Sequence, residues 1–131
     1  MTLRRISYAE DEPDIRAVAE LALTTVGGFE MDISADGVEA LDRIPAYGPD
    51  LILLDVMMPG LDGPEVLRRL AEMDSTRDVP VILMTAKAQK HEIERYMALG
   101  AAGVIAKPFD PMTLHQQVQQ IWDGLSLARE M

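Results

Sequence analysis

The sequence predicts an α/β protein in which a parallel sheet carries helices on both faces. Two short apolar runs, at residues 51–54 (LILL) and 79–84 (VPVILM), end at polar residues. Runs of this length are typical of strands that are buried on both faces of a parallel sheet. Segments with helical spacing lie between the strand candidates, so that strand and helix alternate about five times. This alternation is the pattern of a doubly wound sheet.

Three further strands are predicted from weaker patterns. Residues 29–33 (FEMDI) alternate between apolar and polar side chains, which indicates an edge strand with one face in water. Residues 5–9 (RISYA) and 102–106 (AGVIA) are assigned as strands mainly because of the segments around them.

Five helices are predicted from apolar residues that recur on one face. We expect the first to begin near Pro13 and to stop at Gly27-Gly28, the second to be broken by Pro45 and Gly48, and the last to begin near Asp110-Pro111. The predicted apolar faces comprise, in chain order, Ile15, Val18, Ala19, Ala22 and Val26; Val38, Leu41 and Ile44; Val66, Leu67, Leu70 and Met73; Ile93, Tyr96, Met97 and Gly100; and Leu114, Val118 and Ile121.

Length and composition indicate one globular domain over residues 1–131. Apolar residues make up 48% of the chain and charged residues 26%, which excludes a disordered protein. The net charge is −10, from 22 acidic and 12 basic side chains, and this charge disfavours direct binding to nucleic acid. The absence of cysteine suits a reducing compartment. Because no signal-peptide core or membrane-spanning run is found, we expect a cytoplasmic location without membrane insertion.

Polar residues follow four of the predicted strands at the ends where an open α/β sheet forms its reactive site. The acidic run at 10–12 follows the first strand, Asp55 the third, Thr85 the fourth and Lys107 the fifth. Carboxylates that are packed together repel one another, and a hard divalent cation such as Mg²⁺ relieves that repulsion. The sequence therefore predicts a metal-binding acidic pocket at this edge of the sheet.

Taken singly, each of these residues also has an ordinary structural explanation. The run at 10–12 can be a solvated charge cluster, Asp55 a strand-end cap, Thr85 a turn hydroxyl and Lys107 a surface lysine. All of these explanations would have to hold at once at matching strand ends, and that coincidence disfavours them.

The combined motifs resemble the receiver domain of a bacterial two-component response regulator, in particular the stand-alone chemotaxis type. The resemblance extends over residues 5–122. Its elements are the acid pair, Asp55 followed by Met57-Met58-Pro59-Gly60 and Asp62-Gly63, then Thr85-Ala86, then Lys107-Pro108-Phe109. The resemblance implies a flavodoxin-like (βα)5 fold with strand order 2-1-3-4-5.

The resemblance implies that Asp55 is the phosphoacceptor. Its carboxylate would receive the phosphoryl group of a phosphohistidine on a sensor histidine kinase or a histidine phosphotransfer protein, or that of a small acyl phosphate. Mg²⁺ would be held by Glu10, Asp11, Asp55 and the backbone carbonyl of Met57.

By the same resemblance, Lys107 and Thr85 would contact phosphoryl oxygens, and the Lys107–Pro108 peptide would be cis. The implied function is a phosphorylation-dependent signalling switch that assists its own phosphorylation and dephosphorylation, and not an enzyme with a separate substrate. The first helix would receive the phosphodonor. The last two helices and the fifth strand would contact a downstream protein.

One position departs from the family pattern. The family commonly has a tyrosine or phenylalanine three residues before the lysine, whereas this chain has Val104. Because valine has no ring to reorient, we expect activation to appear in the loop after Thr85 and in the helix at 89–99.

Two other interpretations remain. The chain could be a pseudo-receiver, a binding module that never takes up phosphate, or the isolated receiver domain of a longer regulator with a DNA-binding or enzymatic output domain.

His91 and His115 lie on predicted helices without metal-ligand partners, and we interpret both as surface residues.

Overall fold

The computed structural model describes residues 2–130, with side chains described for residues 2–125. Its centre is one five-stranded sheet in the order β2-β1-β3-β4-β5, in which all neighbouring strands are parallel. The strands are β1 (Arg5–Ala9), β2 (Glu30–Ser34), β3 (Leu51–Asp55), β4 (Val81–Thr85) and β5 (Gly103–Ala106). The predicted strand order is confirmed.

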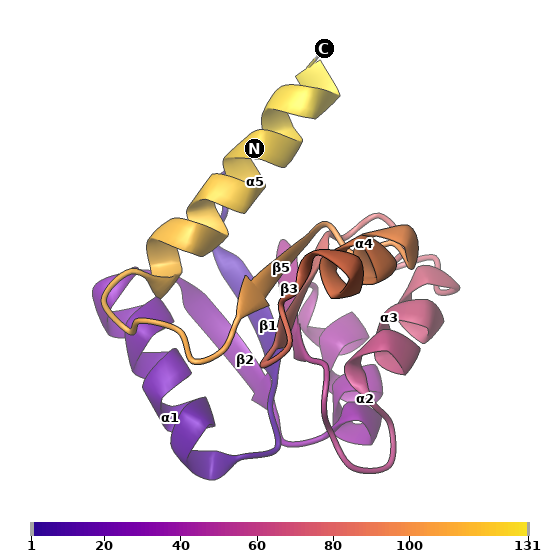
Figure 1. Cartoon of the computed structure of the whole chain (residues 1–131), viewed down its shortest axis with the longest axis horizontal. Coiled ribbons are helices and arrows are strands. Elements are labelled where there is room, and N and C mark those ends of the chain that lie inside the picture. Colours follow the sequence, from indigo (N-terminus) through magenta and orange to yellow (C-terminus); the bar gives the residue numbers. More distant parts are fainter. Residues whose placement is uncertain (1, 131) are drawn as a thin grey trace.

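Helices cover both faces of the sheet (Figure 1). They are α1 (Pro13–Leu21), which continues as a π-helix η1 (Ala22–Val26), followed by α2 (Gly37–Tyr47), α3 (Gly63–Ala71), α4 (Lys90–Ala98) and α5 (Leu114–Glu130). Buried side chains of α1, η1 and α5 form one apolar core with the sheet, and those of α2, α3 and α4 form a second. The doubly wound arrangement predicted from the alternation is therefore correct.

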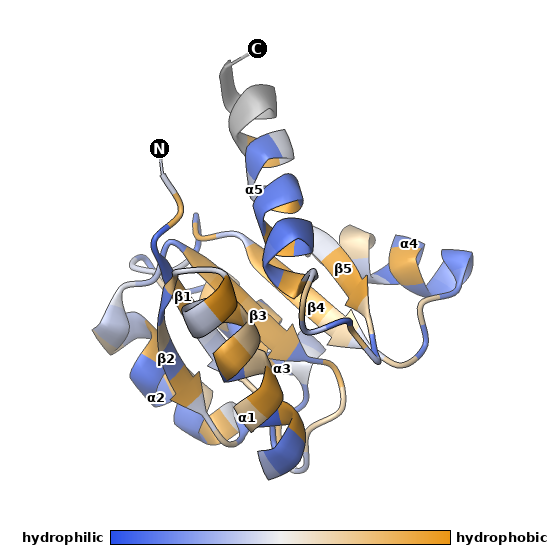
Figure 2. Cartoon of the chain, turned by 90° about the vertical axis from the view of Figure 1, so that its left-hand side faces the viewer, coloured by the Kyte–Doolittle hydropathy of each residue, from blue (hydrophilic) through white to orange (hydrophobic). Residues whose placement is uncertain are grey.

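The burial of the strands follows their place in the sheet. Every residue of β3 and β4 is buried, as expected for central strands that are covered on both faces. The edge strand β2 is only partly buried. Figure 2 shows the same contrast, with a strongly hydrophobic β3 and with hydrophobic and hydrophilic residues mixed in β2. Among the described residues, no helix combines the length and apolarity needed to cross a membrane.

The second helix differs from its predicted form. Pro45 lies inside α2, which ends only at Tyr47, where Gly48 adopts a left-handed conformation (φ 68°) and donates its N–H to the Ile44 carbonyl at 3.2 Å. A proline near the end of a helix removes a single N–H donor, so the stop comes from the glycine.

The buried face of α2 also differs from the predicted one. Gly37, Ala40 and Ile44 are buried, whereas Val38 is 68% exposed. A count of large apolar residues overlooks this face because two of its three residues are small. Elsewhere, Val18, Val26 and Met97 are exposed although their spacing predicted burial.

The last helix begins later than predicted. Asp110 accepts the Met112 N–H through its side chain at 2.9 Å and the Leu114 N–H through its carbonyl at 2.9 Å, so it caps a turn that precedes α5.

His91 is exposed, as expected. His115 is half-buried, contrary to expectation: a Cβ at Gly27 would lie 2.7 Å from the His115 Cβ, and the Nδ1 of His115 is buried without a partner.

The connection between β3 and α3 requires glycine at position 63. The Gly63 N–H donates to the Val56 carbonyl at 3.0 Å. A Cβ at this position would collide with the Asp55 carbonyl oxygen and would lie 3.0 Å from the Val56 Cα. The tight turn thus places the start of α3 directly against the end of β3.

We therefore predict that Gly63→Ala destabilises the fold by about 2 kcal/mol, because backbone atoms must shift to admit the methyl group. Urea unfolding measures this change. The matched control is Gly124→Ala in α5, where a Cβ meets open space. There the substitution should stabilise the protein by about 0.5–1 kcal/mol through helix propensity. Equal effects of the two substitutions would contradict the prediction.

Candidate functional site

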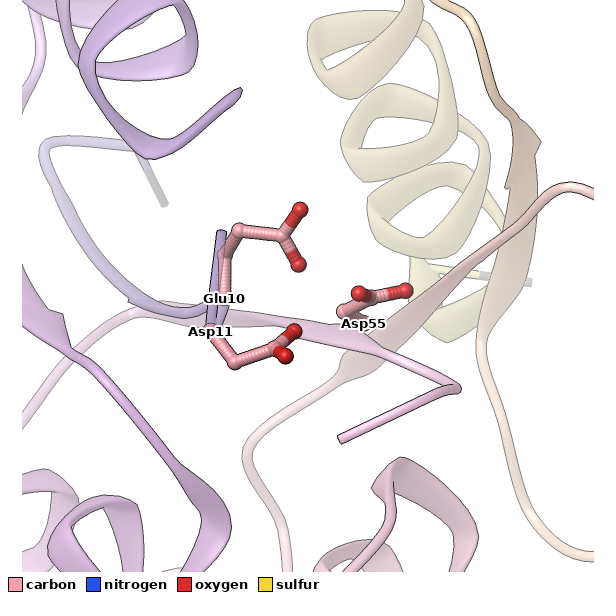
Figure 3. Close-up of side chains that lie close together, drawn as sticks. All are labelled: Glu10, Asp11 and Asp55. Carbon is pink, nitrogen blue, oxygen red and sulfur yellow. The ribbon is translucent and has the colours of Figure 1, made fainter. Parts of the chain in front are cut away.

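Three carboxylates meet at the carboxyl edge of the sheet. Glu10 and Asp11 directly follow β1, and Asp55 is the last residue of β3. Figure 3 shows their side chains directed toward a common space. One oxygen from each lies within 4.8 Å of the others. The predicted convergence of the acid pair and Asp55 is therefore present in the structure.

A single ammonium group joins two of these acids. The Lys107 Nζ donates to Glu10 Oε1 at 3.0 Å and to Asp55 Oδ2 at 3.1 Å. Glu10 is fully buried and Asp55 is 4% exposed, so both contacts lie in a poorly solvated setting. The Lys107–Pro108 peptide is cis, as the resemblance implied.

The donor set of this pocket fits a hard cation. Glu10 Oε2 is buried and has no hydrogen-bond partner, although a buried carboxylate oxygen normally has one. Three acidic side chains face one ammonium group, so negative charge remains uncompensated even when Glu10 is protonated. Oxygen donors of this kind are those that Mg²⁺ prefers.

The charges in the pocket shift the pKa of the groups around it. Burial raises the pKa of Glu10 to about 8, and the neighbouring Asp55 adds to the rise while Lys107 opposes it. Burial lowers the pKa of Lys107, but its hydrogen bonds to Glu10 and Asp55 outweigh this effect and leave the pKa raised. Lys107 is therefore charged at neutral pH. Burial, followed by the charges of Glu10 and Asp55, raises the pKa of Tyr8.

Thr85 lies at the same edge and one residue beyond Met84, the register partner of Asp55. Its side chain is buried, and its Oγ1 accepts the Lys87 N–H at 3.0 Å. The contact from Oγ1 to the Lys87 carbonyl is long, at 3.4 Å, so the hydroxyl proton is only weakly engaged. Thr85 is thus tied to the loop that leads into α4.

Met57 lies two residues beyond Asp55, and its side chain points to solvent with 76% exposed. The ligand role expected of its backbone carbonyl stays a prediction. The next residue, Met58, is buried in the core with α2 and α3.

Sequence reasoning did not single out Arg16. The Arg16 Nη1 donates to the carbonyl oxygen of Glu10 at 2.8 Å and to that of Asp11 at 3.4 Å. The available signal was an arginine one helical turn after the acidic run, where a long side chain can reach back to the strand end.

This sheet topology and this edge cluster are those expected of the receiver-domain class. The profile of the response regulator receiver domain family matches residues 6–119, and the chain belongs to that family. It is thus a component of phosphorylation-dependent two-component signalling.

Named relatives support the same assignment. The phosphate regulon transcriptional regulatory protein PhoB of Escherichia coli is 34% identical over 123 residues, which are 94% of this chain and 53% of PhoB. This chain spans about half the length of the curated relatives it matches.

Two solved structures show the likeness of the fold. The chemotaxis response regulator CheY4 of Vibrio cholerae matches with a TM-score of 0.84 and 28% identity, over 92% of this chain and 99% of CheY4. The receiver domain of the sensor histidine kinase PA1611 of Pseudomonas aeruginosa matches with a TM-score of 0.80 and 32% identity, over 94% and 99% of the two chains. That structure has a magnesium ion coordinated in its active site cleft.

The raised pKa of Glu10 predicts a pH-dependent stability. The folded state binds the Glu10 proton more tightly than the unfolded chain does, because the pKa is about 8 in place of about 4.5. The resulting stabilisation is complete below about pH 4.5 and is lost as the pH rises toward 8. The test is made with a chelator in the buffer, so that no divalent metal ion is bound. Between acidic and alkaline pH, the free energy of unfolding of the wild type should then fall by at least about 1 kcal/mol more than that of Glu10→Gln.

Urea unfolding at a series of pH values measures this difference. Glu72→Gln, at an exposed position on α3's C-terminal cap, serves as the control and should follow the wild type. Parallel pH profiles for the wild type and Glu10→Gln would show that Glu10 does not retain its proton.

Proposed function

We propose that Asp55 accepts a phosphoryl group from a phosphohistidine and that the charged group acts as the signal. The observation that carries this proposal is the Lys107 ammonium, which is shared between Asp55 and the buried Glu10. A phosphoryl group on Asp55 would bring about two negative charges in place of one. Lys107 is then already in place to pair with the added oxygens.

Glu10, Asp11 and Asp55 are proposed to hold Mg²⁺, together with the backbone carbonyl of Met57. The unpartnered Glu10 Oε2 and the cluster of three acids support this assignment. The magnesium ion in the PA1611 receiver domain is further support, since the two chains are 32% identical. When bound, the ion supplies charge neutralisation for the transferred phosphoryl group.

The transfer requires little proton chemistry from the protein. A carboxylate oxygen of Asp55 forms the new O–P bond as the P–N bond of the donor breaks. The electron pair of that bond returns to the imidazole nitrogen, which takes up a proton from solvent. Such a transition state is loose, so alignment and charge neutralisation account for most of the catalysis. Lys107 contributes charge, and Thr85 contributes the donor hydrogen of its hydroxyl.

Thr85 is proposed to couple the phosphoryl group to the surface. Its Oγ1 can donate to a phosphoryl oxygen while still accepting the Lys87 N–H, so a shift of Thr85 moves residues 86–89 with it. Val104 is half-buried against the core on the α4 side of the sheet. Because valine has no ring to swing inward, the backbone link to the loop and to α4 is the proposed route.

The phosphodonor, a sensor histidine kinase or a histidine phosphotransfer protein, is proposed to dock on α1. A cavity of about 240 Å³ lies between α1 and the chain after β5, lined by Asp14, Ile15, Val18, Lys107, Pro108 and Phe109. Lys107 belongs to both this cavity and the acidic cluster. The cavity therefore offers an apolar surface next to the proposed phosphoacceptor, and this position supports the docking assignment.

The downstream partner is proposed to be a protein that contacts α4, β5 and α5. Met97 on α4 and Leu99 just after it are 45% and 52% exposed, which provides apolar contact area next to the proposed moving loop. Because the curated relatives are about twice as long as this chain, a partner on the same polypeptide would be compatible with this surface.

Acetyl phosphate tests the chemistry without a partner protein. With Mg²⁺, the wild type should gain the mass of one phosphoryl group in intact-protein mass spectrometry, and Asp55→Asn should gain none. Asp74→Asn, which changes an exposed aspartate outside the site, should behave as the wild type. Removal of the metal by chelation should abolish the gain. Labelling of Asp55→Asn would favour another acceptor residue. No labelling of the wild type would favour a pseudo-receiver.

The docking surface on α1 has its own test. Val18→Glu should slow phosphoryl transfer from a phosphorylated histidine phosphotransfer protein at least about tenfold, the effect of about 1.4 kcal/mol lost on docking. It should leave labelling by acetyl phosphate unchanged. The matched control is Val38→Glu, an exposed valine on α2 away from the cavity. If both variants slow transfer equally, or if Val18→Glu also slows labelling by acetyl phosphate, the docking assignment is wrong.

A further inference from the structure

Arg16 lies on α1 and reaches back to the end of β1. Its Nη1 donates to the carbonyl of Glu10 at 2.8 Å and, more weakly, to that of Asp11 at 3.4 Å. Its own backbone N–H donates to the carbonyl of Glu12 at 2.9 Å. One residue thereby binds three successive carbonyl oxygens of the acidic run.

These carbonyls lie where the chain leaves the sheet. The Glu10 N–H still bonds to the Ser34 carbonyl of β2 at 3.1 Å, but α1 begins only three residues later, at Pro13. Between these two points no strand ladder fixes the peptide planes of residues 10–12. A buried carbonyl needs a donor, and the planar guanidinium offers several in a rigid arrangement.

We propose that Arg16 is a positioning residue for the magnesium site, which it serves by fixing the backbone that carries Glu10 and Asp11. The inference rests on the proposed Mg²⁺ site. The direction of each side chain is set at its Cα, so held peptide planes keep both carboxylates aimed at the space they share with Asp55. The guanidinium also places a positive charge beside an acidic segment that repels itself.

The expected size of the effect follows from metal sites in general. Groups that orient a ligand without touching the ion typically change metal affinity by 10- to 100-fold when they are removed. Loss of Arg16 leaves all three carboxylates in the chain, so it should weaken Mg²⁺ binding and not abolish it. The phosphorylation rate should then be restored at high Mg²⁺ concentration.

Calorimetric titration with MgCl₂ tests the proposal on the full chain. Arg16→Ala should raise the dissociation constant for Mg²⁺ at least about tenfold. Arg16→Lys keeps the positive charge but lacks the planar set of guanidinium donors, so its dissociation constant should lie between those of Arg16→Ala and the wild type. In acetyl phosphate labelling, the Mg²⁺ concentration for half-maximal rate should rise by the same factor while the maximal rate stays near that of the wild type. Arg43→Ala, which removes an arginine paired with Asp32 on the exposed surface, should change neither value.

The outcomes separate this inference from the function on which it rests. If the wild type binds no Mg²⁺, or if Asp11→Asn binds it as well as the wild type, the proposed magnesium site is wrong. If the wild type binds Mg²⁺ and Arg16→Ala binds it equally well but unfolds more easily, Arg16 is only a structural cap. Should Arg16→Ala not fold, Arg16→Lys and Arg16→Gln decide the question by the same titration, and wild-type affinity in both overturns the proposal.

Discussion

The site depends on the repulsion between carboxylates that the fold brings together at the edge of the sheet. β1 and β3 are neighbouring parallel strands, so Glu10 and Asp55 emerge at the same edge and are buried there. Lys107 offsets part of their charge from the end of β5. Burial, followed by the neighbouring Asp55, raises the pKa of Glu10, and Glu10 Oε2 is left without a hydrogen-bond partner. A divalent cation is the addition that such an arrangement favours.

The rest of the molecule maintains this unfavourable cluster. Central strands that are buried on both faces fix the positions of Asp55 and Thr85. Gly63 admits α3 against the end of β3, and Arg16 holds the main chain of the acidic run. Thr85 Oγ1 accepts a hydrogen bond from the Lys87 N–H. A movement of Thr85 can therefore pass along the main chain to the start of α4.

Much of the fold and site could be predicted from the sequence because strands that are buried on both faces produce a simple pattern. Their ends identify Asp55 and Thr85, and parallel pairing then places both residues at the same edge of the sheet. The failures have equally definite causes. Gly37 and Ala40 are too small to register as an apolar face, so Val38 was wrongly placed in the core. Arg16 was missed because it donates hydrogen bonds to backbone carbonyls. No sequence pattern marks which backbone carbonyls lack a hydrogen-bond partner.

We propose that Asp55, and no other residue, takes up the phosphoryl group. The most direct test is to label the wild-type protein with acetyl phosphate and Mg²⁺, reduce the acyl phosphate with borohydride, and locate the reduced residue by tandem mass spectrometry. We expect homoserine at position 55 alone. Reduction at Glu10 or Asp11, a stable phosphohistidine at His91 or His115, or no labelled residue would contradict it.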